Sequence, residues 1–149
     1  MRQWIVAAGI GLIVVGGTAL AQQSLQDLSA ERRGLMRQQL QAVRAITPVV
    51  QAGGEPRSVL QQAEAVLSTA QRKRTLFPPG SDRDDDRARP EIWSNRAEFD
   101  RAGAALIEAA QRLVAAASAN DRTAFAAAFQ ATTAACTSCH QQFQLPQRQ

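Results

Sequence analysis

Residues 121–143 read DRTAFAAAFQATTAACTSCHQQF, and this stretch decides the fold of the 149-residue chain. Its large, sulfur-bearing and imidazole side chains recur at steps of four, seven, four and three residues. In order along the chain they are Phe125, Phe129, Cys136, His140 and Phe143. Side chains at these spacings share one face of an α-helix, so the stretch predicts an amphipathic helix.

Three more amphipathic stretches lie upstream, and segments rich in Gly, Pro or Asp separate them. The first predicted helix covers roughly 24–47 and is ended by Pro48 and Gly53–Gly54. The second begins at Pro56 and ends near Arg74. The third opens at Pro90–Glu91, and the fourth is capped by Asn120 or Asp121. Between Phe77 and Pro90 we expect a long, solvated loop that is not a buried element. No segment alternates like a strand, so the fold class is all-α, an antiparallel up-down four-helix bundle.

The inward positions of the last two helices are unusually small, because alanine dominates them. The whole chain has no Tyr and only five Phe. Side chains alone would leave a thin core, which a bulky, flat cofactor could complete. Alanine that merely lets helices approach closely explains the same pattern, and composition does not decide between the two.

The N-terminal segment predicts export. An apolar run from Trp4 to Leu20 follows Arg2 and leads to Ala19-Leu20-Ala21, an A-x-A cleavage site. We therefore expect a signal peptide at 1–21, a single domain at 22–149, a periplasmic location and no membrane contact after cleavage. The alternative is an uncleaved membrane anchor, because the run is nearly long enough to span a bilayer.

Charge argues against nucleic-acid binding. The net charge of the chain is +4, and its arginines are spread among Asp and Glu instead of forming a basic strip. Aromatic residues, which stack on bases, are few.

The run Cys136-Thr137-Ser138-Cys139-His140 is a C-x-x-C-H motif, the attachment signature of a c-type haem. On a helix the two thiols and the imidazole project toward one patch about a turn long. Both thiols can then form thioethers with the two vinyl groups of one haem, while the imidazole binds iron as the proximal ligand. The motif thus predicts one covalent haem c near the C-terminal helix, held by Cys136, Cys139 and His140.

Three other uses of the motif fit less well. A redox dithiol favours a helix N-terminus after a strand, whereas this pair lies late in a helix. Zinc needs four ligands, and the chain has two Cys and one His. A disulfide between cysteines three apart in a helix would be strained.

The chain resembles the class II c-type cytochromes, the family of cytochrome c-prime and its low-spin relatives. The similarity covers nearly all of 22–149. It rests on residues 32–36 (RRGLM), 76–78 (LFP), 90–93 (PEIW), and the C-x-x-C-H motif with Phe143, of which only the haem motif is highly specific.

The resemblance implies that Met36 lies on the distal side of the iron. In the low-spin members a methionine sulfur at this position binds iron, whereas in cytochrome c-prime proper the position is usually apolar and the iron is open to NO or CO. Met36 can also simply pack in the core. The resemblance further implies that Arg32 faces a haem propionate, although a solvated surface arginine fits the pattern nearly as well. One departure is Gln144, where many members have Arg or Lys.

The leading functional prediction is a periplasmic one-electron carrier with His140 as proximal and Met36 as distal ligand. The alternative is a five-coordinate cytochrome c-prime that binds NO or CO, and a haem-free helical adaptor ranks last. No catalytic residue set is visible, because the single histidine is occupied and no nucleophile has a base beside it, so we expect no enzyme activity. Expected partners are redox proteins, NO or CO, and a second copy of the chain, since dimers are common in the family.

Overall fold

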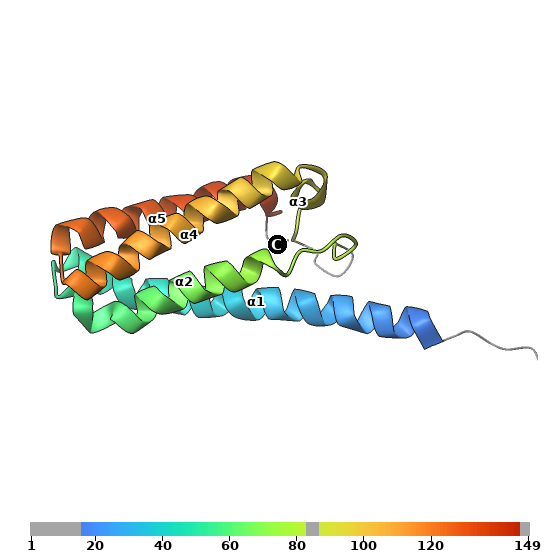
Figure 1. Cartoon of the computed structure of the whole chain (residues 1–149), viewed down its shortest axis with the longest axis horizontal. Helices are drawn as coiled ribbons and strands as arrows, with labels where there is room; N and C mark the ends of the chain where they lie inside the picture. The colour runs from blue at the N-terminus through green and yellow to red at the C-terminus, as the bar shows by residue number, and fades with distance from the viewer. Residues whose placement is uncertain (1–15, 83–86, 147–149) are drawn as a thin grey trace, which may run out of the picture.

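The computed structural model describes residues 16–82 and 87–146, and four long helices dominate them. These are α1 (Gly16–Gln51), α2 (Leu60–Arg74), α4 (Arg96–Ala119) and α5 (Arg122–Phe143). A 3₁₀ turn, η1 (Pro56–Val59), precedes α2, and a single turn, α3 (Glu91–Ser94), precedes α4. Successive long helices run in opposite directions (Figure 1), so the predicted up-down four-helix bundle is confirmed.

The helices form two pairs. The first pair is α1 with α2 and the second is α4 with α5, while α2 packs on α4 to join them. Helices α1 and α5 also touch, but they pack much less extensively than these three pairs. The two pairs are therefore joined mainly through α2 and α4.

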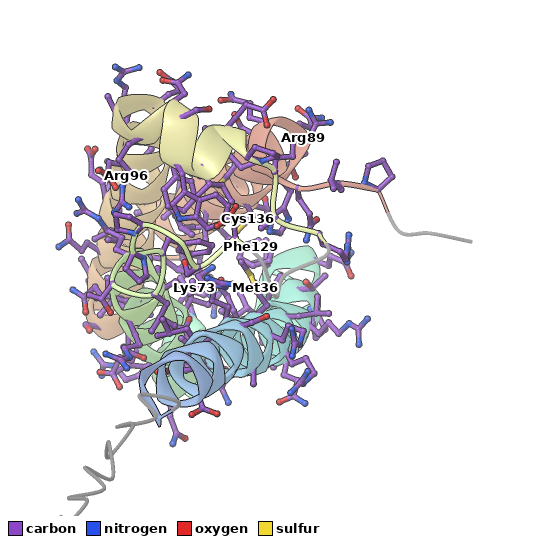
Figure 2. The ribbon with its side chains drawn as sticks, turned by 90° about the vertical axis from the view of Figure 1, so that its right-hand side faces the viewer. Met36, Lys73, Arg89, Arg96, Phe129 and Cys136 are labelled. Atoms are coloured by element: carbon purple, nitrogen blue, oxygen red, sulfur yellow. The ribbon has the colours of Figure 1, made fainter. Side chains whose placement is uncertain are left out.

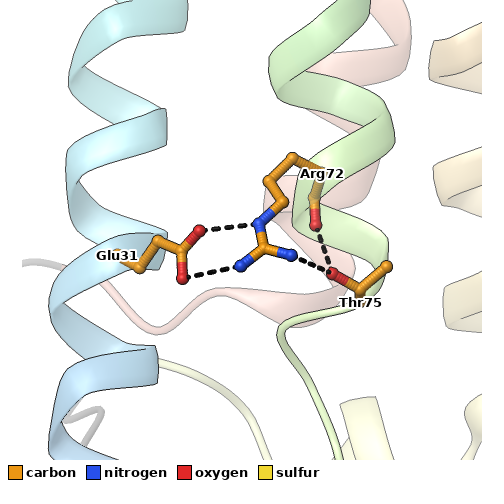
Figure 3. A network of polar contacts seen from close by, with 3 residues as sticks. All are labelled: Glu31, Arg72 and Thr75. Atoms are coloured by element: carbon orange, nitrogen blue, oxygen red, sulfur yellow. Dashed lines mark hydrogen bonds and ion pairs between the residues drawn. The ribbon is translucent and has the colours of Figure 1, made fainter.

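A salt bridge between Arg72 and Glu31 also joins α2 to α1 at the surface of the bundle. The Arg72 guanidinium donates from Nε and Nη2 to the two carboxylate oxygens of Glu31, at 2.7 and 3.1 Å (Figure 3). Its Nη1 also donates to Thr75 Oγ1 at 3.4 Å. The Arg72 hydrogen bond lowers the pKa of Glu31, so this carboxylate is ionised across the neutral range.

The end of α1 differs from the prediction. Helix α1 continues past the expected limit at residue 47 and through Pro48 to Gln51. In the last turn proline removes a single backbone hydrogen bond, which the helix tolerates. The stop comes from Gly53–Gly54, as predicted. Gly53 has φ +59°, and the N–H groups of Gly53 and Gly54 donate to the Val50 and Val49 carbonyls, which is the Schellman arrangement.

The third predicted helix opens at Glu91 but is not continuous, because it breaks at Asn95. Side chains on both sides of the break bind the loop after α2. Trp93 Nε1 donates to the Pro78 carbonyl at 2.9 Å, and Arg96 Nη1 donates to the Phe77 carbonyl at 2.7 Å. These tertiary bonds explain the separate turn α3.

The loop after α2 corrects another expectation, since it is not wholly solvated. Phe77 is 8% exposed and Ser81 is 1% exposed. Further along, Leu145 N–H donates to the Arg87 carbonyl and Arg89 N–H to the Phe143 carbonyl, so 87–89 runs beside the end of α5. Phe77 and Ser81 thus belong to the buried interior at this end of the bundle.

Two hydrophobic clusters fill the bundle. The alanine-rich cluster includes Ile46, Val66, Ala110, Leu113, Ala117 and Phe125. The aromatic cluster consists of Leu76, Phe77, Ile92 and Phe143, with Trp93 and Phe99 packed against them. Only the aromatic cluster lies beside the C-x-x-C-H motif, because Cys139 packs against it.

The cap of α5 is as predicted. Asn120 adopts the left-handed conformation that ends α4, and the Asp121 carboxylate accepts from Ala124 N–H at 2.9 Å. The expected signal segment 1–21 lies mostly outside the described residues, although α1 already runs through Ala21. Within the described part, no helix is long and apolar enough to cross a membrane.

Candidate haem-binding site

A cavity of about 430 Å³ lies at the aromatic end of the bundle, and cofactor pockets are typically of roughly 300–1,000 Å³. Its apolar lining is Met36, Phe77, Ala88, Ile92, Phe99, Cys139 and Phe143. Its polar lining is Arg32, Arg33, Arg37, Arg87, His140 and Gln144. The cavity therefore has apolar walls with cationic groups among them, and none of residues 16–82 and 87–146 contributes a lining carboxylate.

Edge-to-face rings shape the apolar wall. The Phe99 ring centroid lies 4.9 Å from that of Phe77 and 5.3 Å from that of Phe143, with steep interplanar angles. Such pairs fix the positions of the rings on α4, α5 and the loop relative to one another. The wall is rigid enough to receive a flat apolar molecule.

The C-x-x-C-H motif lies in the last turns of α5, as predicted. Cys139 and His140 line the cavity, and Cys136 is half-buried one turn earlier. Both cysteines are free thiols, so they are not spent on a disulfide. Viewed from the open end, Cys136 lies in the middle of the bundle, whereas Arg89 and Arg96 lie at its periphery (Figure 2).

Burial and nearby cations set the protonation states of the three motif side chains. Burial raises the pKa of Cys136 and of Cys139, with the Lys73 cation opposing this, so both thiols are protonated at neutral pH. Partial burial of the ring, together with the cations Lys73 and Arg87, lowers the pKa of His140. The imidazole is thus neutral, the form whose nitrogen lone pair can bind a metal.

Met36 on α1 is half-buried and lines the same cavity as His140 on α5. Its sulfur is not isolated, since Lys73 Nζ donates to Met36 Sδ at 3.4 Å. The same Nζ donates to Gln39 Oε1 at 2.5 Å. Figure 2 shows Met36 and Lys73 close together in the interior.

Arg32 is buried, with 2% of its surface exposed, so the expectation of a solvated surface arginine is wrong. Its Nη1 donates to the Leu76 carbonyl at 2.9 Å and to Ser81 Oγ at 3.2 Å, and its Nη2 donates to the Ser81 carbonyl at 2.9 Å. The guanidinium carbon lies 4.7 Å from the centre of the Phe77 ring. Arg32 therefore ties the loop after α2 to α1, besides lining the cavity.

Sequence reasoning missed several residues of the site. Arg33, Arg37 and Arg87 line the cavity beside Arg32, and nothing in their spacing distinguishes them from the other arginines of the chain. Lys73 had a usable signal. It lies three residues after Ala70 and seven after Val66, both buried on α2, and so shares their inward face.

The residues present fit a covalent haem c. Two thiols and a neutral imidazole lie within one turn and a half of a helix, next to a cavity with an aromatic wall and cationic groups suited to propionates. A zinc site does not fit, because among residues 16–82 and 87–146 no group of three His, Cys, Asp or Glu side chains could hold a metal ion.

Comparison with known proteins agrees with this fit. The sequence model of the family described as Cytochrome C' matches residues 27–144. The cytochrome c' of Rhodopseudomonas palustris is 30% identical over 142 residues, which cover 93% of this chain and 94% of that protein. The cytochrome c' of Alcaligenes xylosoxydans xylosoxydans is 35% identical over 97 residues, covering 64% of this chain and 75% of that protein.

Solved structures give the same answer. A nitric oxide complex of a mutant cytochrome c prime from Alcaligenes xylosoxidans superposes with a TM-score of 0.77 at 26% identity, covering 83% of this chain and 97% of that one. A carbon monoxide complex of another variant superposes with a TM-score of 0.76 at 27% identity, covering 82% and 97%.

Fold and site together define a c-type haem protein built on a four-helix bundle. More particularly, the chain belongs to the cytochrome c' family, and its cofactor is one covalently bound haem c. The predicted family, fold class and cofactor are thereby confirmed.

Proposed function

We propose that this chain is a gas-binding cytochrome c' whose haem is attached through Cys136 and Cys139 and whose iron is bound by His140. When bound, the haem supplies an iron whose open position takes up NO or CO. Met36, which lines the cavity, would pack against the haem without binding its iron, and the apolar wall of the cavity would exclude water. The alternative given by the sequence is thus preferred over the one-electron carrier.

The observation that carries the proposal is the contact of Met36. A thioether sulfur is a weak acceptor, and the Lys73 ammonium already occupies it at 3.4 Å. A sulfur held beside this ammonium shares electron density with a cation, which makes it a poorer donor to a metal ion. The NO and CO complexes described for similar structures support the same choice.

The electron carrier remains the second candidate, because Met36 and His140 line one cavity. If the sulfur bound iron, it would raise the reduction potential and close the gas site. Redox proteins would then be the partners. In either case we propose a periplasmic protein that works by binding or by electron transfer and not as an enzyme. We also propose that Arg32 lies near a haem propionate and that the protein is a homodimer.

An absorption spectrum of the haem-loaded protein tests the proposal. We expect a high-spin ferric spectrum, and a ferrous spectrum that shifts when CO or NO is added. Met36→Leu should leave both spectra nearly unchanged, because leucine has a similar volume and no donor atom.

A low-spin ferric spectrum with a weak sulfur-to-iron band that disappears in Met36→Leu would contradict the gas-binding proposal and support the carrier. Haem attachment has its own test in Cys136→Ser and Cys139→Ser, whose intact masses should report whether the pigment is still linked through the remaining thiol.

A further inference from the structure

Lys73 is the only lysine of the chain, and the last turn of α2 points it into the bundle. It is half-buried, with Nζ held between Met36 Sδ at 3.4 Å and Gln39 Oε1 at 2.5 Å. Gln39 is itself buried on α1. The ammonium therefore bridges α2 to the face of α1 that carries the distal methionine.

The surroundings of the Lys73 ammonium impose a desolvation cost on its charge. Both acceptors are neutral, and the ammonium is partly withdrawn from solvent. A partly desolvated cation without a charged partner among these groups destabilises a fold, so its presence at the site points to a role in the site.

We propose that Lys73 is a specificity-determining residue of the gas site, because its hydrogen bond to Met36 Sδ holds the thioether away from the iron and leaves the distal position open to NO or CO. This inference deepens the proposed function and rests on it. Met36 has a sulfur that would close the gas site if it bound the iron. The hydrogen bond from Lys73 is donated to that sulfur.

The position of Lys73 also allows a competing role, in which the ammonium pairs with a haem propionate. A propionate partner would stabilise the loaded protein and change its reduction potential. It would not change whether sulfur binds iron. The spin state therefore separates the two roles.

The test compares loaded wild type, Lys73→Leu, Lys73→Arg and the double variant Met36→Leu with Lys73→Leu. In Lys73→Leu we expect a low-spin ferric spectrum with a sulfur-to-iron band. CO affinity should fall about tenfold if about one tenth of the iron remains open. Lys73→Arg keeps a cationic donor and should stay high-spin. The double variant lacks the sulfur and should be high-spin again.

Arg74→Leu is the matched control, because Arg74 is the exposed neighbour on α2 and loses the same charge. It should behave as wild type in spin state and CO affinity. If Lys73→Leu does not accumulate, Lys73→Ala removes the same donor and carries the same expectation.

If wild type is high-spin, as the proposed function requires, two results would overturn the Lys73 proposal and leave the proposed function standing. In the first, Lys73→Leu stays high-spin with the CO affinity of wild type, as a propionate partner predicts. In the second, its low-spin spectrum persists in the double variant, so that sulfur is not the new ligand. A wild type that is already sulfur-ligated would instead refute the proposed function, and the Lys73 proposal with it.

Discussion

At the scale of single residues, the site depends on cationic side chains held in apolar surroundings. Arg32 and Lys73 both come from helix positions that face inward, and both reach across to another element. Arg32 satisfies the backbone of the loop after α2, whereas Lys73 contacts the side chain of Met36. The Arg32 bonds hold the loop in place, whereas the Lys73 bond reaches a side chain that lines the haem cavity.

Replacement of Arg32 by Leu should destabilise the loaded protein, because the Leu76 and Ser81 carbonyls lose their buried donor. We expect a loss of about 3 kcal/mol in the free energy of unfolding, measured with urea. Arg32→Lys should recover only part of it, since an ammonium lacks the planar fork of donors. Arg44→Leu, at an exposed arginine of the same helix outside the cavity lining, is the control and should cost at most about 0.5 kcal/mol. Equal stability of the two Leu variants would contradict the structural role of Arg32.

At the scale of elements, the α1–α2 pair is joined on its outer side by the bidentate contact of Arg72 with Glu31. The two side chains are substantially exposed, so the contribution is modest and screened by salt. Its pH dependence follows from the lowered pKa of Glu31. A carboxyl group with a lower pKa in the folded state stabilises the fold above its unfolded pKa, and this contribution is lost as the pH falls through the folded value.

Glu31→Gln should therefore lower the melting temperature slightly at about pH 6, and the difference from wild type should disappear as the pH falls through the lowered pKa of Glu31. Thermal unfolding at several pH values measures it. Glu64→Gln removes an exposed carboxylate of α2 and should follow wild type at each pH. A Glu31→Gln difference that is independent of pH would show that the ion pair is not its cause.

The elements also show how far the sequence could predict the structure. The helical face of α5, the Asp121 cap and the glycine stop of α1 depend on local spacing and local hydrogen bonds, and they were predicted. The break at Asn95 and the burial of Phe77 and Ser81 were not, because they arise from bonds between segments far apart in sequence. Lys73 escaped notice because it lies between Arg72 and Arg74 and looks like part of a solvated helix end.

At the scale of the whole molecule, the bundle divides its interior between two ends. The alanine-rich cluster shares no residue with the cavity lining, whereas the aromatic cluster supplies much of that lining. Close helix approach accounts for the alanines of the first cluster. The space for a cofactor lies at the other end, beside the aromatic rings.

Variants in the two clusters should have different effects. Leu113→Ala in the alanine-rich cluster should cost about 2–5 kcal/mol of stability and leave the ferric spectrum of the folded protein unchanged. Phe99→Leu removes a ring that contacts Phe77 and Phe143, and it should change the spectrum with a smaller loss of stability. Urea unfolding and absorption spectra of both variants check this, and a spectral change in Leu113→Ala alone would contradict the division.

Because the alanine-rich cluster shares no residue with the cavity lining, we expect it to form before the pigment is joined to the chain. The slight packing of α1 on α5 leaves the opposite end less tightly closed, with both thiols near the chain terminus. We therefore expect the haem-free chain to keep part of its helical structure until the porphyrin is linked.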